Sequence, residues 1–310
     1  MKLKMAADQV LKRFSRQIRK EDAIKTSMSA LPIAVQKTRG TNTRPKRRSR
    51  GTGSLFRLAH RGAALALFVG LWQLAVQAKL HFLINFGNVP GPVAVAGAFI
   101  EFVQSPDAAR HIGASLIRIF SGFGIGAILA VPIGIWVARS RAVEDTLLTP
   151  LEILRPIPAV AWIPLSILMF ATAEQSIIYI CFIGAFYPIL LSTIHGVKGI
   201  DRRLLNAAQS LGAGRWEVFW EVILPGAFPS IVTGLSIGMG TCWFSLITAE
   251  MMAGQFGIGY LTWESYTLQN YPQIVVGMVL IGLLGMLSSL LVRKLGSMLM
   301  PWTRRGGVAE

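Results

Sequence analysis

The chain has 310 residues, of which 53% are hydrophobic and 15% are charged, and this is more apolar material than the core of a soluble protein of that length needs. The composition therefore indicates a membrane protein. The formal net charge of +16 does not indicate a nucleic-acid partner, because residues 1–61 alone hold 17 Lys and Arg residues against three acidic ones.

The basic segment 1–61 has two parts. Near its start, apolar residues recur at helical spacing among Lys and Arg, a pattern typical of a helix that lies on an anionic membrane surface. These apolar residues are Val10, Leu11, Phe14 and Ile18. Residues 26–54 are rich in Ser, Thr, Gly and Arg, which predicts a disordered linker. We expect residues 1–61 to form a largely disordered tail, which acts either as a solvated determinant of orientation or through a surface helix.

Six apolar stretches are long enough to cross a bilayer, for which a helix needs about 20 residues. All six are expected to be helical, because a helix satisfies its own backbone hydrogen bonds in lipid. They lie near residues 62–80, 112–138, 154–173, 176–194, 226–249 and 273–292. The sequence therefore predicts an all-α membrane protein with six spans.

The distribution of Lys and Arg predicts the orientation of these spans. If the N-terminus is cytoplasmic, the outside loops contain only Lys79 and Arg110, and almost all other basic residues lie inside. Cytoplasmic loops carry an excess of Lys and Arg, so both termini are expected in the cytoplasm.

Glycine and proline recur within the predicted spans. In the second span, Gly122, Gly126, Ala130 and Gly134 are spaced by four residues, which would let a neighbouring helix approach closely. Prolines interrupt the third, fourth and fifth spans and free backbone groups, as in helices that line a pathway. They are Pro156, Pro158, Pro164, Pro188, Pro225 and Pro229. This pattern favours a bundle that moves over a rigid anchor or scaffold.

Two charged residues lie near the predicted outer ends of spans. Arg118 is in the second span, about 9 Å deep at 1.5 Å per residue, and Glu250 ends the fifth. Charges within the membrane are costly unless they are paired or functional. We expect these two to pair as a structural or gating contact, with contact between Arg118 and an anionic substrate as the alternative.

Motifs of catalysis, metal binding and nucleotide binding are missing from the sequence. Cys181 and Cys242 lie in different predicted spans and form no CxxC pair, so we interpret them as packing residues. The four histidines are scattered, and neither a metal nor a cofactor is expected. No GxSxG, HExxH or GxxxxGK[ST] pattern occurs, so this chain has no P-loop for ATP.

The longest segment predicted inside, residues 195–225, reads as two short amphipathic helices separated by Gly212, Ala213 and Gly214, with Pro225 at the start of the next span. The first predicted apolar face is made of Leu204, Ala207, Ala208 and Leu211, and the second of Trp216, Phe219, Trp220 and Ile223. Helices this short are marginal alone, so these faces must rest on the bundle or on a partner.

Two other interpretations apply to a pair of short helices. A DNA-reading helix-turn-helix is excluded, because its second helix carries Arg215 against Glu217 and Glu221. A hairpin that merely closes the connection between two spans stays open on periodicity alone.

The segment resembles the EAA loop of ABC-transporter permeases, in which Glu-Ala-Ala is followed by a spaced Gly and an Ile-x-Leu-Pro end. Asn206, Ala207 and Ala208 match the first three places, with Asn206 in place of the usual Glu. Gly212 follows at the family spacing, and residues 222–225 close the pattern. In that family the loop is the coupling helix that docks on the ATP-binding subunit.

Further stretches narrow the resemblance to the nitrate, sulfonate and taurine class of these permeases (NitT/TauT-like). LRPIPAVAWIPL at 154–165 is similar to that class's third span, and ASLIRIFSGFGIG at 114–126 to its second. TAEMMAGQFGIGYL at 248–261 looks like its outer loop after the fifth span. The resemblance covers roughly residues 62–302, which implies a permease domain there, a tail over 1–61 and a cytoplasmic end over 303–310.

The resemblance implies a six-helix type I importer permease (MetI-like) fold in the inner membrane, working as a dimer, usually of two identical copies. The implied partners are two ABC ATP-binding subunits inside and a periplasmic substrate-binding protein outside. It places the docking contact on the coupling loop, namely Asn206, Ala207, Ala208, Gly212, Ala213, Leu224 and Pro225. The candidates for translocation or gating are Arg118, Pro156, Pro158, Trp162 and Glu250.

We therefore expect a non-enzymatic permease subunit of an ATP-driven importer for a small anion such as nitrate, a sulfonate, taurine or bicarbonate. Import of a heterocyclic vitamin precursor by the same machinery is the alternative. A membrane-embedded enzyme is less favoured, because paired carboxylates, a His cluster and a nucleophile motif are missing. A pure scaffold is disfavoured by the Gly and Pro density.

Overall fold

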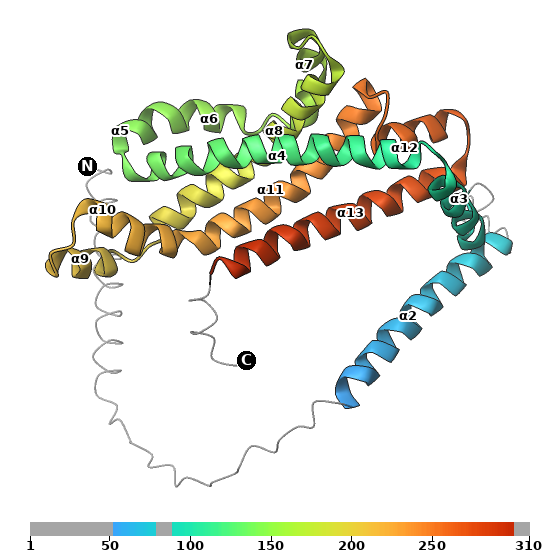
Figure 1. Cartoon of the computed structure of the whole chain (residues 1–310), viewed down its shortest axis with the longest axis horizontal. Coiled ribbons are helices and arrows are strands. Elements are labelled where there is room, and N and C mark those ends of the chain that lie inside the picture. Colours follow the sequence, from blue (N-terminus) through green and yellow to red (C-terminus); the bar gives the residue numbers. More distant parts are fainter. Residues whose placement is uncertain (1–51, 79–88, 301–310) are drawn as a thin grey trace, which may run out of the picture. The chain divides into compact units, whose positions relative to one another are not determined.

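The computed structural model describes residues 52–78 and 89–300, and every regular element within them is a helix (Figure 1). The predictions for residues 1–51, 79–88 and 301–310 lie outside the described residues. From His60 onward the chain forms one compact unit.

Four of the described helices are long and apolar enough to cross a membrane, or five spans result if one bent pair counts as a span. The four are α4 (Ala108–Arg139), α8 (Ala173–Lys198), the run Arg215–Ala253 that contains α11 (Leu224–Ala253), and α13 (Tyr271–Met298). They correspond to the predicted second, fourth, fifth and sixth spans. The prediction of an all-helical membrane protein is confirmed.

The predicted third span is not one continuous helix. The chain instead forms two apolar pieces, Arg141–Leu154 and Ala159–Met169, bent by 85° at the intervening turn. Pro156 and Pro158 lie in that turn, and a proline both lacks an N–H and disfavours helical backbone in the residue before it. The elements are α5 (Arg141–Val143), a π turn (Glu144–Leu148), α6 (Thr149–Leu154), a 3₁₀ turn (Ala159–Trp162) and α7 (Ile163–Met169).

The remaining helices are shorter. α2 (Thr52–Gln77) begins ten residues before the predicted first span, and its apolar part, Gly62–Gln77, is shorter than a standard span. α3 (Pro92–Gln104) and α12 (Ile258–Thr267) were not predicted. α9 (Arg202–Ser210) and α10 (Arg215–Glu217) occupy the segment expected to hold two short helices.

Helix α8 is the centre of the bundle. In its most apolar window 61% of the residues are buried, against 22% in α13, so α8 is enclosed by protein while α13 offers most of its surface outward. The predicted small-residue face of α4 packs on α8: a Cβ added at Gly126 would lie 3.1 Å from the Cβ of Ala185, and one at Gly134 2.9 Å from that of Thr193. The close approach predicted from the glycine spacing is confirmed.

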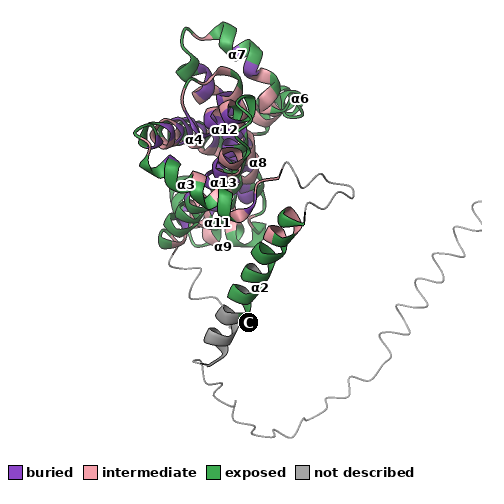
Figure 2. Cartoon of the chain, turned by 90° about the vertical axis from the view of Figure 1, so that its right-hand side faces the viewer, coloured by how far each residue is buried: buried purple, intermediate pink, exposed green. Residues whose placement is uncertain are grey.

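Helix α11 packs on the other side of α8 by the same means. An added Cβ at Gly234 would lie 2.5 Å from Ser192, and one at Gly238 2.8 Å from Ile189. Figure 2 shows the buried residues gathered where α4, α8 and α11 meet. The bundle places α9 and α10 at one end and α3 and α12 at the other (Figure 1).

Candidate functional site

The guanidinium of Arg118 lies at the end of the bundle that contains α12. It is 2% exposed, and its Nη1 donates to Glu250 Oε1 at 2.9 Å and to the carbonyl oxygen of Phe256 at 2.6 Å. On its other side it forms a bidentate pair with Glu174, in which Nε donates to Oε2 at 2.7 Å and Nη2 donates to Oε1. The predicted pairing of Arg118 with Glu250 is confirmed.

Glu250 is fully buried, and both of its carboxylate oxygens accept hydrogen bonds. Ser115 Oγ lies 2.8 and 3.0 Å from the two oxygens, and the backbone N–H of Gly259 donates to Oε2 at 2.9 Å. Ser115 Oγ in turn accepts the N–H of Ile258 at 2.9 Å. The carboxylate of Glu250 is thus bound by three residues from two helices, Ser115 and Arg118 of α4 and Gly259 of α12, which is the condition under which a buried carboxylate is tolerated.

The glycine-rich stretch after α11 is shaped by this carboxylate. Gly257 has φ +131°, a backbone conformation essentially restricted to glycine, and a Cβ there would collide with the Glu250 carboxylate. His111 Nδ1 lies 3.1 Å from the Gly257 amide nitrogen and 3.0 Å from the Gly257 carbonyl oxygen, so it accepts the amide hydrogen in one tautomer and donates to the carbonyl in the other. We call Arg118, Glu174, Glu250, Ser115 and His111 the Arg118 cluster.

Glu174 is the member of this cluster that sequence reasoning missed. It lies in the first turn of α8, after the N-cap Thr172, and its side chain is 60% exposed. Acidic residues are common in first turns because they complement the helix dipole, so its position alone did not distinguish it. The sequence did offer one indication: a guanidinium has five N–H donors, so a buried arginine needs more than one acceptor.

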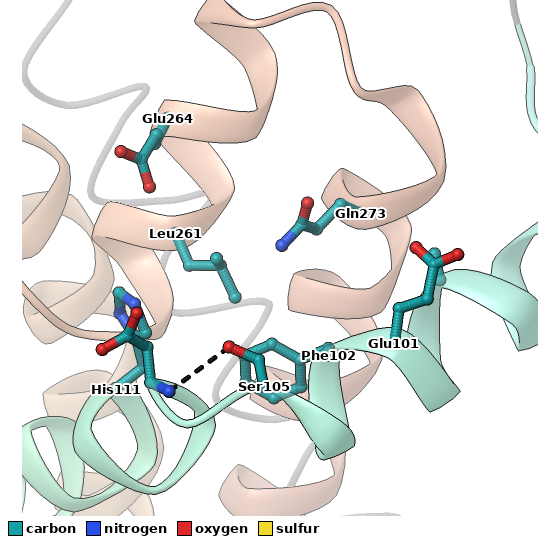
Figure 3. Close-up of a pocket in the computed structure, with 9 residues that line it drawn as sticks. Glu101, Phe102, Ser105, His111, Leu261, Glu264 and Gln273 are labelled. Atoms are coloured by element: carbon teal, nitrogen blue, oxygen red, sulfur yellow. Dashed lines mark hydrogen bonds between the residues drawn. The ribbon is translucent and has the colours of Figure 1, made fainter.

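A pocket of about 260 Å³ lies beside the cluster, between α3, the start of α4, α12 and the start of α13. Figure 3 shows Glu101, Glu264 and Gln273 around it, with His111 at its floor. The Asp107 N–H donates to Ser105 Oγ at 3.3 Å at its edge. Three carboxylates border the pocket, so its potential is unsuited to hold an anion.

The proline-rich bend brings together the other predicted gating residues. Pro156 and Pro158 are exposed in the turn, whereas Trp162 is partly buried against the central core. The indole nitrogen of Trp162 is fully buried and has no hydrogen-bond acceptor in the part of the chain that the structure describes. An unsatisfied buried donor costs free energy and marks the bend as a place of strain.

The loop of residues 201–225, which we call the connecting loop, lies at the opposite end. Asp201 caps α9 by accepting the Arg203 N–H at 2.8 Å. The helix ends in a Schellman motif: the Gly212 N–H donates to the Gln209 carbonyl at 3.0 Å and the Ala213 N–H to the Ala208 carbonyl at 3.1 Å. Gly212 has φ +87°, which is why glycine is required there.

The first apolar face predicted for the connecting loop is divided by the structure. Ala208 and Ala213 pack on the bundle, while Leu204 is 59% and Leu211 90% exposed, and Asn206 and Ala207 are exposed too. The predicted face therefore does not rest on the bundle as one unit, because α9 packs Leu205 and Ala208 against it instead. The loop keeps an apolar surface that none of residues 52–78 and 89–300 covers.

Pro225 lies in the first turn of α11 (Leu224–Ala253), where the next span was predicted to start. The helical run is continuous from Arg215 to Ala253, through a π turn at Val218–Ile223 directly before Leu224 and Pro225. A π turn re-registers the backbone, so a missing proline N–H is accommodated without ending the helix. The connecting loop is thereby joined rigidly to α11.

The chain is similar to known transport proteins. Residues 130–305 match the family described as binding-protein-dependent transport system inner membrane component. An ABC transporter permease protein of Methanocaldococcus jannaschii is 42% identical over 56% of this chain and 65% of that relative. The nitrate import permease protein NrtB of Synechocystis is 28% identical over 83% of this chain and 96% of that protein. The aliphatic sulfonates transport permease protein SsuC of Escherichia coli is 35% identical over 76% and 88%.

Membrane-length helices packed around a glycine-lined centre define a multi-pass helical membrane protein. The chain belongs to the family of binding-protein-dependent transport system inner membrane components. It is the permease subunit of an ABC importer and not an enzyme. Membership implies an ATP-binding subunit and a substrate-binding protein as partners.

Proposed function

We propose that this permease imports a small anion of the nitrate, sulfonate, taurine or bicarbonate kind. The similarity to the nitrate import permease NrtB and to the aliphatic sulfonates transport permease SsuC supports this substrate class. In this proposal the permease works as a homodimer in the inner membrane, residues 62–302 form the permease domain, and both termini and the connecting loop are cytoplasmic. A periplasmic binding protein delivers the substrate to the opposite end.

We propose further that the connecting loop docks on the ATP-binding subunit. The observation that carries this is the exposure of Leu204 and Leu211 on a helix capped at both ends, since a rigid element with an uncovered apolar face is suited to enter a cleft in a partner. Asn206 and Ala207 are exposed on the same helix. Gly212 and Ala213 cap its C-terminal end, and Leu224 and Pro225 begin α11 at the end of the connecting loop.

The docking proposal is tested by co-purification of the ATP-binding subunit with tagged permease. Leu211→Arg is expected to abolish co-purification without affecting folding, because its side chain is 90% exposed. Leu268→Arg is the matched control, since Leu268 is 72% exposed at the other end of the bundle. Unchanged recovery of the ATP-binding subunit with Leu211→Arg would reject the docking site.

The substrate class is tested in proteoliposomes that contain the full importer and its binding protein. Nitrate, taurine, an alkanesulfonate and bicarbonate are each compared with a heterocyclic vitamin precursor as stimulators of ATP hydrolysis. Stimulation by one of the anions is expected. Stimulation by the vitamin precursor alone would replace the anion proposal by its alternative.

For gating, we propose that the bend with Pro156, Pro158 and Trp162 changes conformation during transport, while Arg118 and Glu250 hold the end of the bundle. The orphaned indole N–H supports this, because a second conformation can supply its acceptor. Trp162→Phe keeps an aromatic ring but removes the donor. It is expected to slow transport without lowering the temperature of thermal unfolding, because it removes an unsatisfied buried donor. Unaltered transport would contradict the proposal.

A further inference from the structure

A second apolar feature lies between α4 and the C-terminal half of the connecting loop. A groove of about 680 Å³ opens between the last turns of α4 and the first turns of the Arg215–Ala253 helix. We call it the Trp–Arg groove and define it by Ile135, Trp136, Arg139, Arg215, Trp216 and Trp220. Its volume is in the range of small-molecule sites.

The position of the groove along the helices places it at the membrane surface. The Arg215–Ala253 helix has 39 residues and is roughly 58 Å long, whereas the hydrocarbon core is only about 30 Å thick, so its ends project into the interface. Trp136, Trp216 and Trp220 are 59%, 70% and 50% exposed. Exposed tryptophans at one level of a helical bundle are typical of the headgroup region.

The rim of the groove carries two cations without counter-ions. Among the residues that the structure describes, neither Arg139 nor Arg215 has a carboxylate partner. The guanidinium of Arg139 lies 5.6 Å from the ring centroid of Phe219, which fixes it over the aromatic floor. The carboxylate of Glu217 accepts the Gly214 N–H at 2.7 Å and pairs with neither arginine.

The surroundings add to this positive charge. Arg141 and Arg202 line a neighbouring cavity of about 540 Å³ that shares Arg139 with the Trp–Arg groove. The nearby Lys198 is neutralised by Glu144 at 2.5 Å. The groove thus has an apolar wall next to arginines without carboxylate partners. This arrangement is complementary to a phospholipid, whose acyl chain lies next to an anionic headgroup.

We propose that the Trp–Arg groove binds one anionic phospholipid, with Arg139 and Arg215 on its phosphate and an acyl chain along Ile135 and Trp136. The inference requires a membrane-embedded permease but not the docking role of the connecting loop. Because the helix that carries Arg215 continues into α11, a lipid held here restrains the same helix that the connecting loop moves.

The assay is native mass spectrometry of the intact transporter complex, released from nanodiscs with equimolar phosphatidylglycerol and phosphatidylcholine. The wild type is expected to retain phosphatidylglycerol preferentially. Arg139→Gln and Arg215→Gln should each lower that preference about fivefold, and the double variant about 25-fold. Arg293→Gln, an exposed arginine on α13 outside the groove, is the matched control and should keep the wild-type preference.

Two further experiments distinguish a bound phospholipid from other ligands of the groove. Arg139→Lys with Arg215→Lys keeps the charge and should keep most of the preference, which guards against a fold defect in the Gln variants. Soluble glycerol phosphate should not displace the lipid; displacement would make this a free-phosphate site and overturn the proposal. The proposal would also be overturned if both lipids were retained equally. It would be overturned too if the permease alone held the lipid and lost it once the ATP-binding subunit had assembled.

Discussion

The Arg118 cluster and the connecting loop lie at opposite ends of one bundle and are built in opposite ways. The cluster joins residues far apart in sequence and satisfies its charges internally: Arg118 is 2% exposed, Glu250 fully buried. The loop is held by local hydrogen bonds between neighbours and leaves Leu211 90% exposed. The first is paired within the described part of the chain, whereas the second leaves an apolar surface that the described residues do not cover.

This difference predicts that changes in the cluster act on folding and changes in the loop act on local order and association. The largest effect is expected for Glu250→Ala, which leaves Arg118 buried with only Glu174 as a counter-ion. Removing one member of a buried pair costs about 3–5 kcal/mol. Thermal unfolding in detergent should show this loss as a lowered Tm.

A double-mutant cycle sharpens the same comparison. Because the two side chains act as a unit, Glu250→Ala should add little to Arg118→Ala. Full additivity of the two losses would show that the pair contributes no coupling energy.

The next effect is expected at Gly257. Gly257→Ala forces a Cβ into a conformation with φ +131° and against the Glu250 carboxylate, which should cost about 1–3 kcal/mol of unfolding free energy. Gly113→Ala is the control, since nothing lies within 4 Å of a Cβ placed there in α4. Equal stability of the two variants would show that the loop relaxes around the new methyl group.

In the connecting loop, Asp201→Ala removes the cap of α9. The expected cost is about 1 kcal/mol, confined to α9, because the Arg203 N–H loses its acceptor. Hydrogen exchange should accelerate for the amides of α9 while the Tm of the bundle stays unchanged. Asp201→Asn, which keeps a capping oxygen, should exchange like the wild type. A lowered Tm of the whole bundle would contradict the separation of the two regions.

The smallest effect is expected for Glu174→Gln. Glu174 is 60% exposed and Arg118 keeps Glu250, so the loss should be at most about 1 kcal/mol. The measurement is the difference in Tm between this variant and Glu250→Ala. A loss as large as that of Glu250→Ala would mean that the exposed carboxylate carries the cluster.

Long apolar runs and isolated charges made much of this structure predictable. Four spans and the Arg118–Glu250 pair follow from the cost of backbone and charge in lipid, which leaves few alternatives. Helix α3 was not predicted because its 13 residues are too few to cross a membrane. The bend at Pro156 was not predicted because membrane helices often tolerate proline. The role of Gly257 was not predicted because it depends on the carboxylate of Glu250, seven residues earlier, which folds back over it.

One helix connects the two ends. Arg215 lies in the first turn of the run that ends at Ala253, and Glu250 lies in its last turn, about 50 Å away at 1.5 Å per residue. If docking of the ATP-binding subunit displaced the Arg215 end, the same helix would carry the displacement towards Glu250. There the hydrogen bonds of Arg118 to Glu250 and Glu174 tie α11 to α4 and α8.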